Sequence, residues 1–338
     1  GELLLRADLQ RLLAELDRVG LLETDAFAAR RRAVEEAFRA SPVRAAQHAG
    51  ASYPEDPDEL RAVLDGYLGG VDPGELDGLA PRGIIAPHID FPRGGWCYGW
   101  GYAALRASRA TSFVVLGVAH TAPPAPVVLT EKSFETPLGT VPVDRELVRA
   151  LTARTGDLTA HEIVHRTEHS LEFPIVFMQR ALDGRPFSIV PILCSSFEGW
   201  AAEEPPRGVD EVERVVSGLR EVMRARPDVG LVVSVDFSHV GPRFGDPDPV
   251  TDALASRTSL ADRVVLEAIV RGDPDEFWRT TAAGGNPRHI DALSAVYTAL
   301  RVLEPVEGRL LRYGQALDPA GGIVSFASLA LLEGTRRP

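Results

Sequence analysis

Short, continuously apolar segments alternate along this chain with segments of helical periodicity. Because each run is apolar throughout rather than at every second position, we expect strands that are buried on both faces of a sheet. Strands alternating with helices indicate an α/β fold, with a central, mostly parallel sheet flanked by helices. The expected strands are residues 83–87, 113–118, 127–129, 187–194, 230–235 and 310–313, and the expected helices are 58–69, 96–107, 144–155, 171–183, 208–226, 248–271 and 289–303.

The first forty residues have a different pattern. Leucines recur at helical spacing from Leu9 to Leu16, and a weaker apolar stripe follows a break near Gly20. We therefore expect an N-terminal helical extension over residues 1–41 and an α/β domain over residues 42–338.

Charge, hydropathy and cysteine content disfavour several classes of protein. The net charge is −12, from 36 basic and 48 acidic residues, which disfavours a nucleic-acid partner or an anionic membrane surface. No apolar run approaches the roughly 20 residues that span a bilayer. The two cysteines, Cys97 and Cys194, provide neither a disulfide framework nor a cysteine-rich zinc site. We expect a cytoplasmic protein.

Two histidines follow separate expected strands: His88 comes after residues 83–87, and His120 after residues 113–118. Ligands of open α/β sheets gather outside the carboxyl ends of the strands. We expect these strands to be neighbours in the sheet, so that the two imidazoles meet and bind a first-row transition metal. The alternative for each histidine is a structural one, in which the ring caps a helix or bonds a backbone carbonyl.

Asp236 and His239 follow the strand at residues 230–235. If the chain turns into a helix there, the carboxylate and the imidazole can hydrogen-bond to each other, which fixes the tautomer and raises the basicity of the ring. This pair suits general acid–base catalysis. A purely structural Asp–His pair is the alternative.

Other candidates lie in expected loops and at a helix start. His169 and Glu172 either belong to the site, as substrate-binding residues, or only cap the helix that begins near them. Arg93 is a candidate for binding a substrate carboxylate or phosphate. We expect the remaining histidines of the polar segments to be exposed to solvent; they are His48, His161 and His165.

Taken together and in order, these segments resemble the Memo family, in particular the AmmeMemoRadiSam system protein B. The resemblance extends over about residues 42–338. The segments that carry it are Pro42–Arg44, His48–Pro54, the expected helix Pro57–Leu68, Ala86–Gly95, Leu116–Thr121, Thr136–Gly139, Glu168–Glu172 and Ser234–His239.

The Memo family is similar in fold to the class III extradiol ring-cleaving dioxygenases, which hold non-haem Fe(II) with two histidines and a carboxylate and use a further histidine as acid–base. The resemblance implies that His88 and His120 bind the metal and that His239, with Asp236 behind it, moves the proton of a small-molecule substrate. Fe(II) is the expected metal, and Cu or Zn also fits two imidazoles. The resemblance further implies a radical SAM protein and an AMMECR-type protein as partners.

The third ligand is where the chain departs from the family. Memo proteins often place a Cys-Gly pair before the last core helix, but residues 284–291 contain no cysteine. His289 or Asp291 can replace the thiolate, His239 can bind the metal itself, or the site has no third protein ligand. A second hypothesis is therefore a catalytically silent relative whose cleft binds a peptide or partner protein. A third is a zinc hydrolase.

Overall fold

The computed structural model describes residues 6–199, 203–247, 249–318 and 320–334. The chain divides into two compact units, Gly1–Pro42 and Val43–Pro338. The first unit contains α1 (Arg6–Arg18) and α2 (Asp25–Ala40), as expected for a helical extension. Its second helix begins after Thr24, whose side chain accepts a hydrogen bond from the Phe27 amide.

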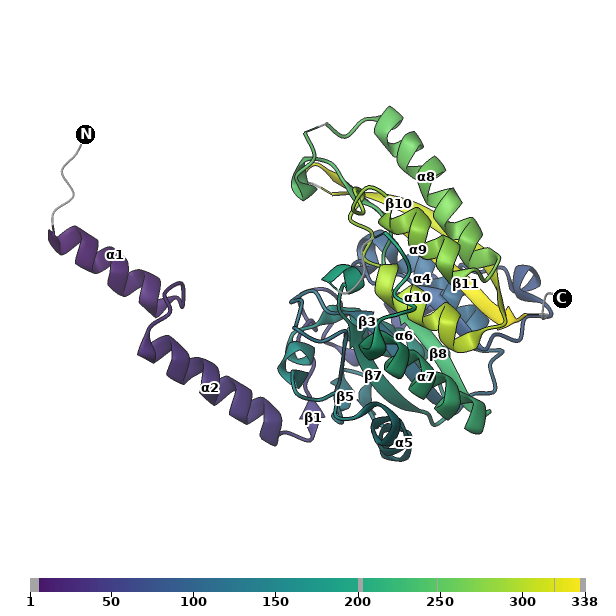
Figure 1. The fold of residues 1–338 in the computed structure, drawn as a ribbon, viewed down its shortest axis with the longest axis horizontal. Coiled ribbons are helices and arrows are strands. Elements are labelled where there is room, and N and C mark those ends of the chain that lie inside the picture. Colours follow the sequence, from purple (N-terminus) through teal and green to yellow (C-terminus); the bar gives the residue numbers. More distant parts are fainter. Residues whose placement is uncertain (1–5, 200–202, 248, 319, 335–338) are drawn as a thin grey trace. The chain divides into compact units, whose positions relative to one another are not determined.

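The second unit is built on an eight-stranded sheet with a parallel centre and antiparallel edges (Figure 1). The four central strands run parallel to one another and are almost entirely buried. Antiparallel strands flank this parallel centre on both sides, so the sheet is mixed, as a mostly parallel α/β sheet allows. Along the sheet the strands are β10 (Val306–Asp318), β11 (Gly322–Glu333), β2 (Gly83–Ala86), β8 (Val229–Ser234), β3 (Ser112–Val118), β7 (Ser188–Cys194) and β4 (Val127–Leu129), and β9 (His239–Val240) pairs with β11.

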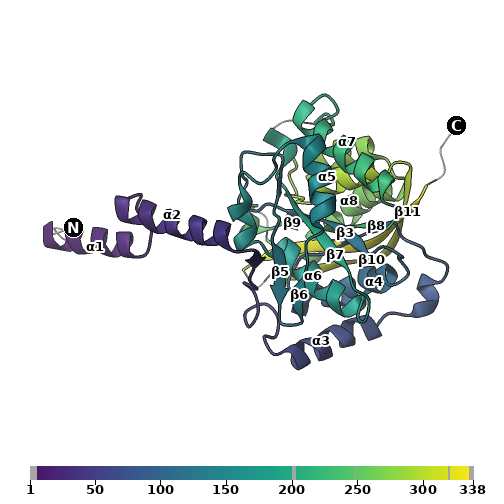
Figure 2. The same cartoon turned by 90° about the horizontal axis from the view of Figure 1, so that it is seen from below.

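Helices cover both faces of this sheet (Figure 2). One apolar core lies beneath α5 (Arg145–Thr155), α7 (Asp210–Ala225), α8 (Asp252–Val270), α9 (Pro274–Ala282) and α10 (Leu293–Leu303). A second core, rich in aromatic side chains, lies beneath α3 (Pro57–Gly69), α4 (Phe91–Leu105) and α6 (His169–Ala181). The remaining elements are a small sheet of β1 (Val43–Arg44), β5 (Ser133–Thr136) and β6 (Gly139–Val141), and the 3-10 segments η1 (Pro73–Leu76), η2 (Glu162–Arg166), η3 (Phe197–Gly199) and η4 (Pro242–Phe244).

Two details of the expected topology were wrong. The strands before His88 and His120 are not neighbours, because β8 lies between β2 and β3 and pairs with both. Helix α4 also begins earlier than expected: the Asp90 side chain accepts a hydrogen bond from the Arg93 amide, and Pro92 suits the first turn.

None of the helices within the described ranges is long and apolar enough to cross a membrane.

The close packing of α3 against α4 requires a glycine at position 99. A Cβ at Gly99 would lie far inside van der Waals distance of the Tyr67 carbonyl oxygen, whereas one at Gly66 meets nothing within 4 Å. Gly99→Ala should therefore lower the free energy of unfolding by about 1–3 kcal/mol. Gly66→Ala should raise it by roughly 0.5–1 kcal/mol through helix propensity. Urea unfolding measures both, and equal stabilities for the two variants would contradict this packing.

Candidate metal centre

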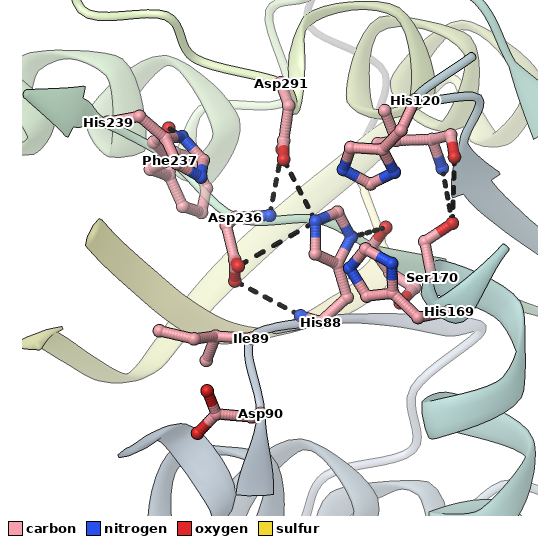
Figure 3. Close-up of polar contacts among 12 residues, drawn as sticks. His88, Ile89, Asp90, His120, His169, Ser170, Asp236, Phe237, His239 and Asp291 are labelled. Carbon is pink, nitrogen blue, oxygen red and sulfur yellow. Dashed lines mark hydrogen bonds and ion pairs between the residues drawn. The ribbon is translucent and has the colours of Figure 1, made fainter. Parts of the chain in front are cut away.

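Three histidines from three elements gather at the carboxyl edge of the sheet (Figure 3). His88 follows β2, His120 follows β3, and His169 begins α6. Each offers a ring nitrogen, and these nitrogens all lie within 4.8 Å of one another. The ring centroids are 5.2 Å apart for His88 and His120 and 4.7 Å apart for His120 and His169. This group can hold a metal ion.

The start of α6 is held directly against the end of β3. The Ser170 hydroxyl donates to the Val118 carbonyl at 2.9 Å and accepts from the Val118 amide at 3.0 Å. A side chain at Gly117 would collide with this hydroxyl, so glycine permits the approach. The contact places His169 beside His120.

His88 is buried between two carboxylates. Its Nδ1 lies 3.1 Å from the Ser234 carbonyl oxygen, so Nδ1 carries a proton and Nε2 is the free position. Nε2 lies 3.0 Å from Oδ2 of Asp291 and 3.8 Å from Oδ2 of Asp236. Burial lowers the pKa of His88, but these two charges outweigh it and raise the pKa to about 10. The two carboxylates therefore stabilise a positive charge at Nε2, either a proton or a metal ion.

The two carboxylates beside His88 are fixed by backbone amides. Oδ1 of Asp236 accepts from the His88 amide at 3.1 Å, and Oδ1 of Asp291 accepts from the Asp236 amide at 3.0 Å. Burial raises the pKa of Asp236, and the neighbouring Asp291 charge adds to this. For Asp291, burial also raises the pKa, but the charge and hydrogen bond of His88 outweigh it, so the pKa lies below its usual value. His88 therefore stabilises the carboxylate form of Asp291.

Glu168 orients His120, a role that the sequence did not indicate. Oε1 lies 2.9 Å from Nδ1 of His120, and Oε2 accepts from the His120 amide at 3.1 Å. This fixes the proton on Nδ1 and leaves Nε2 for a metal. Burial raises the pKa of Glu168, but its hydrogen bond with His120 and the His120 charge hold it well below the usual value. The only sequence signal was the capping pattern, since Glu168 also accepts from the Ser170 amide.

His169 is neutral at ordinary pH. Burial lowers its pKa, and the nearby His88 charge adds to this, giving a value of about 3. Its Nδ1 lies 3.3 Å from Oε1 of Glu168. A neutral imidazole in this place can contact either a metal or a bound substrate.

The expected hydrogen bond between Asp236 and His239 does not form. The chain enters strand β9 rather than a helix, and Asp236 faces His88 instead. Nδ1 of His239 lies 3.0 Å from the Phe237 carbonyl oxygen and 3.1 Å from that of His289. His239 also lies outside the group of three histidines (Figure 3). The interpretation of His239 as a metal ligand is therefore not supported.

Glu172 does not line the cavity, so its interpretation as a substrate-binding residue is not supported. It is fully buried in an ion pair with Arg44, and it accepts hydrogen bonds from the Tyr53 hydroxyl and from the His48 amide, the latter at 2.9 Å. Burial raises its pKa, but Arg44 outweighs burial and lowers it. This carboxylate joins α6 to the segment that follows β1, which is a structural role.

His289, the other candidate for a third ligand, is exposed and has a φ of +49°. It supplies only its carbonyl oxygen to His239. Of the two third-ligand candidates in this loop, Asp291 is the one whose side chain reaches His88.

An open cavity of about 440 Å³ lies above these groups. Arg93 donates to Asp90 at 2.7 Å and to Asp318 at 3.1 Å, and Arg243 donates to the other oxygen of Asp318 at 3.2 Å. His48 also lines the cavity, although it was expected to be solvated with no role. The lining residues are His48, Ser52, His88, Ile89, Asp90, Arg93, His120, His169, Phe173, Asp236, His239, Arg243, Phe244, Asp318 and Val324.

Comparison with known proteins gives consistent matches. The family model described as "Memo-like protein" matches residues 44–330. A MEMO1 family protein of Thermus thermophilus is 32% identical over 336 residues, covering 98% of this chain and 95% of that protein. A MEMO1 family protein of Methanosarcina barkeri is 30% identical over 285 residues, covering 83% of this chain and 97% of that protein.

Glu168→Gln should weaken the binding of a divalent metal about 10–100-fold, because an amide no longer fixes the His120 tautomer as a carboxylate does. Isothermal titration with Co²⁺ measures the affinity. Glu162→Gln is the control, because Glu162 bonds Thr130 and Lys132 away from the cavity. An affinity for Glu168→Gln within twofold of the wild type would contradict this role.

His165, which was expected to be solvated, is instead fully buried, with Nε2 3.0 Å from the Val128 carbonyl oxygen. Burial lowers its pKa to about 3. The unfolded chain, with a histidine pKa of about 6.5, binds a proton that the folded chain excludes, so stability falls as pH drops below about 6.5.

Replacing this ring should reduce the acid sensitivity. Between pH 7 and pH 5, His165→Gln should lose roughly 2 kcal/mol less stability than the wild type. Urea unfolding at both pH values measures this difference, with His161→Gln as control. An unchanged pH dependence in His165→Gln would show that the ring is not buried in its neutral form.

Proposed function

This chain belongs to the Memo-like family, and from that premise we propose that it is a metal-dependent enzyme with non-haem Fe(II), an oxidoreductase of dioxygenase type. The observation that carries the proposal is the 3.0 Å separation between Nε2 of His88 and Oδ2 of Asp291, beside two further imidazoles. Two neighbouring ligands with bonds of about 2.1 Å lie roughly 3 Å apart.

We propose that His88 and His120 bind the metal together with Asp291, which lies outside the group of three histidines but whose carboxylate contacts Nε2 of His88. Asp291 as a ligand supplies a negative charge in direct contact with the ion, which a third neutral imidazole does not. Asp291 comes from the loop in which Memo proteins often carry a cysteine, so a carboxylate replaces the thiolate. Oxygen and nitrogen donors without sulfur favour Fe(II) over Cu(I), and Zn also fits.

The other residues of the site have separate roles in the proposed reaction. An Fe(II) ion, when bound, supplies Lewis-acid activation of a substrate hydroxyl and redox chemistry with O₂. His239 keeps the proton on Nδ1, facing two carbonyl oxygens, so its Nε2 can accept a substrate proton as general base. Asp236 contributes to the site by accepting a hydrogen bond from the His88 amide, and it does not orient His239.

The substrate is proposed to be a small molecule with an anionic group. Arg93 and Arg243 converge on one carboxylate, Asp318, at the wall of the cavity, and each guanidinium has further donors for a carboxylate or phosphate. His169, neutral and beside His120, is proposed to contact the substrate. A radical SAM protein and an AMMECR-type protein are proposed partners, and a cytoplasmic location is proposed because Cys97 and Cys194 are both free.

Elemental analysis of protein purified without oxygen tests the assignment. The wild type should contain nearly one iron per chain, and His88→Ala and Asp291→Ala should lose it because each removes a ligand. His289→Asn should retain it, since that side chain lies outside the site and asparagine tolerates a positive φ.

Two outcomes would favour the other functions. Protein that is free of metal, and whose stability ignores added Fe(II), would indicate the silent module that binds a peptide or protein, because a ligand selective for the folded state must stabilise it. Retained zinc, with ester or amide hydrolysis and no O₂ consumption, would indicate a hydrolase.

A further inference from the structure

Behind the cavity, four side chains converge on the buried carboxylate of Asp262 in α8, which has no exposed surface. Its Oδ1 accepts hydrogen bonds from Ser238 at 2.5 Å and from Arg288 at 2.6 Å. Its Oδ2 accepts from the hydroxyls of Tyr313 at 2.9 Å and Ser325 at 2.6 Å. Neither Asp262 nor Arg288 lines the cavity.

Two of these donors belong to the loops that carry the site residues. Ser238 lies between Asp236 and His239, and Arg288 comes three residues before Asp291. The two loops are also joined directly, because the His239 amide donates to the Arg288 carbonyl oxygen at 2.7 Å.

The loop of Arg288 is a turn closed by the Asn286 side chain. The Asn286 side chain accepts from the Ile290 amide and donates to the Ile290 carbonyl oxygen, both at 3.0 Å. Asn286 and His289 have positive φ values of 54° and 49°, which tighten the turn. An anchor on Arg288 therefore also fixes the residue that follows the turn, Asp291.

We propose that Asp262 and Arg288 are positioning residues of the metal centre: their ion pair holds the loop of Asp291 against the loop of His239. The part of this inference that concerns the metal rests on the proposed function. A buried ion pair is a costly way to gain stability alone, because apolar residues of similar size often serve as well. Here both charged groups fix segments that carry the donor Asp291 and the base His239.

Titration with Co²⁺ alone, at a temperature where every variant is fully folded, tests the first consequence. Arg288→Met should lower the Co²⁺ affinity at least about 10-fold, as is typical when outer partners of ligands are lost. Arg288→Lys, which keeps a cation, should recover part of the loss.

Arg301→Met is the matched control, because it breaks another largely buried ion pair, that of Arg301 with Glu213 between α10 and α7. It should lower the melting temperature and leave the Co²⁺ affinity within twofold of the wild type. Equal losses of affinity in Arg288→Met and Arg301→Met would overturn the proposal, since a general loss of stability would then explain both.

Hydrogen exchange on metal-free protein tests the positioning independently of any metal. Arg288→Met should speed exchange of the Asp236 and His239 amides, whose acceptors lie in the anchored loop, and leave the β3 amides unchanged. If the wild type binds no Co²⁺, the proposed function fails, and the exchange rates alone then test whether Asp262 and Arg288 position the two loops. Unchanged exchange at both amides would overturn the positioning role.

Discussion

The Nε2 atom of His88 lies 3.0 Å from Oδ2 of Asp291, where little solvent reaches, and this contact determines the character of the site. Carboxylates that are removed from water need a positive partner. Because Nδ1 of His88 is committed to the Ser234 carbonyl, the positive charge must lie at Nε2, as a proton or as a metal ion. The edge of the sheet is thus built to hold a cation.

The order of strands explains why residues far apart in sequence meet there. β8 lies between β2 and β3, so Asp236 emerges between the segments that carry His88 and His120. The start of α6 then covers this edge through Ser170 and brings His169 to the same point. Convergence therefore follows from three parallel strands with a common direction and one helix start bonded to β3.

The sequence was sufficient for the fold class and for the convergence of His88 and His120, because buried strands read as apolar runs and their carboxyl ends share one edge. It was insufficient wherever a long-range partner decides the role of a residue. Glu172 has the sequence position of a site residue, but Arg44, 128 positions away, neutralises it. Asp236 and His239 are close in sequence, but the chain extends into β9, so their side chains point to different partners. Glu168 gave only a capping signal although it also orients His120.

The most direct test of the proposed metal site is an anomalous difference map, recorded at the iron edge, from crystals grown with Fe(II) in the absence of oxygen. We expect a single peak about 2.0–2.2 Å from nitrogen atoms of His88 and His120 and from a carboxylate oxygen of Asp291. A peak bound by His169 in place of Asp291, or no peak among these residues, would contradict it.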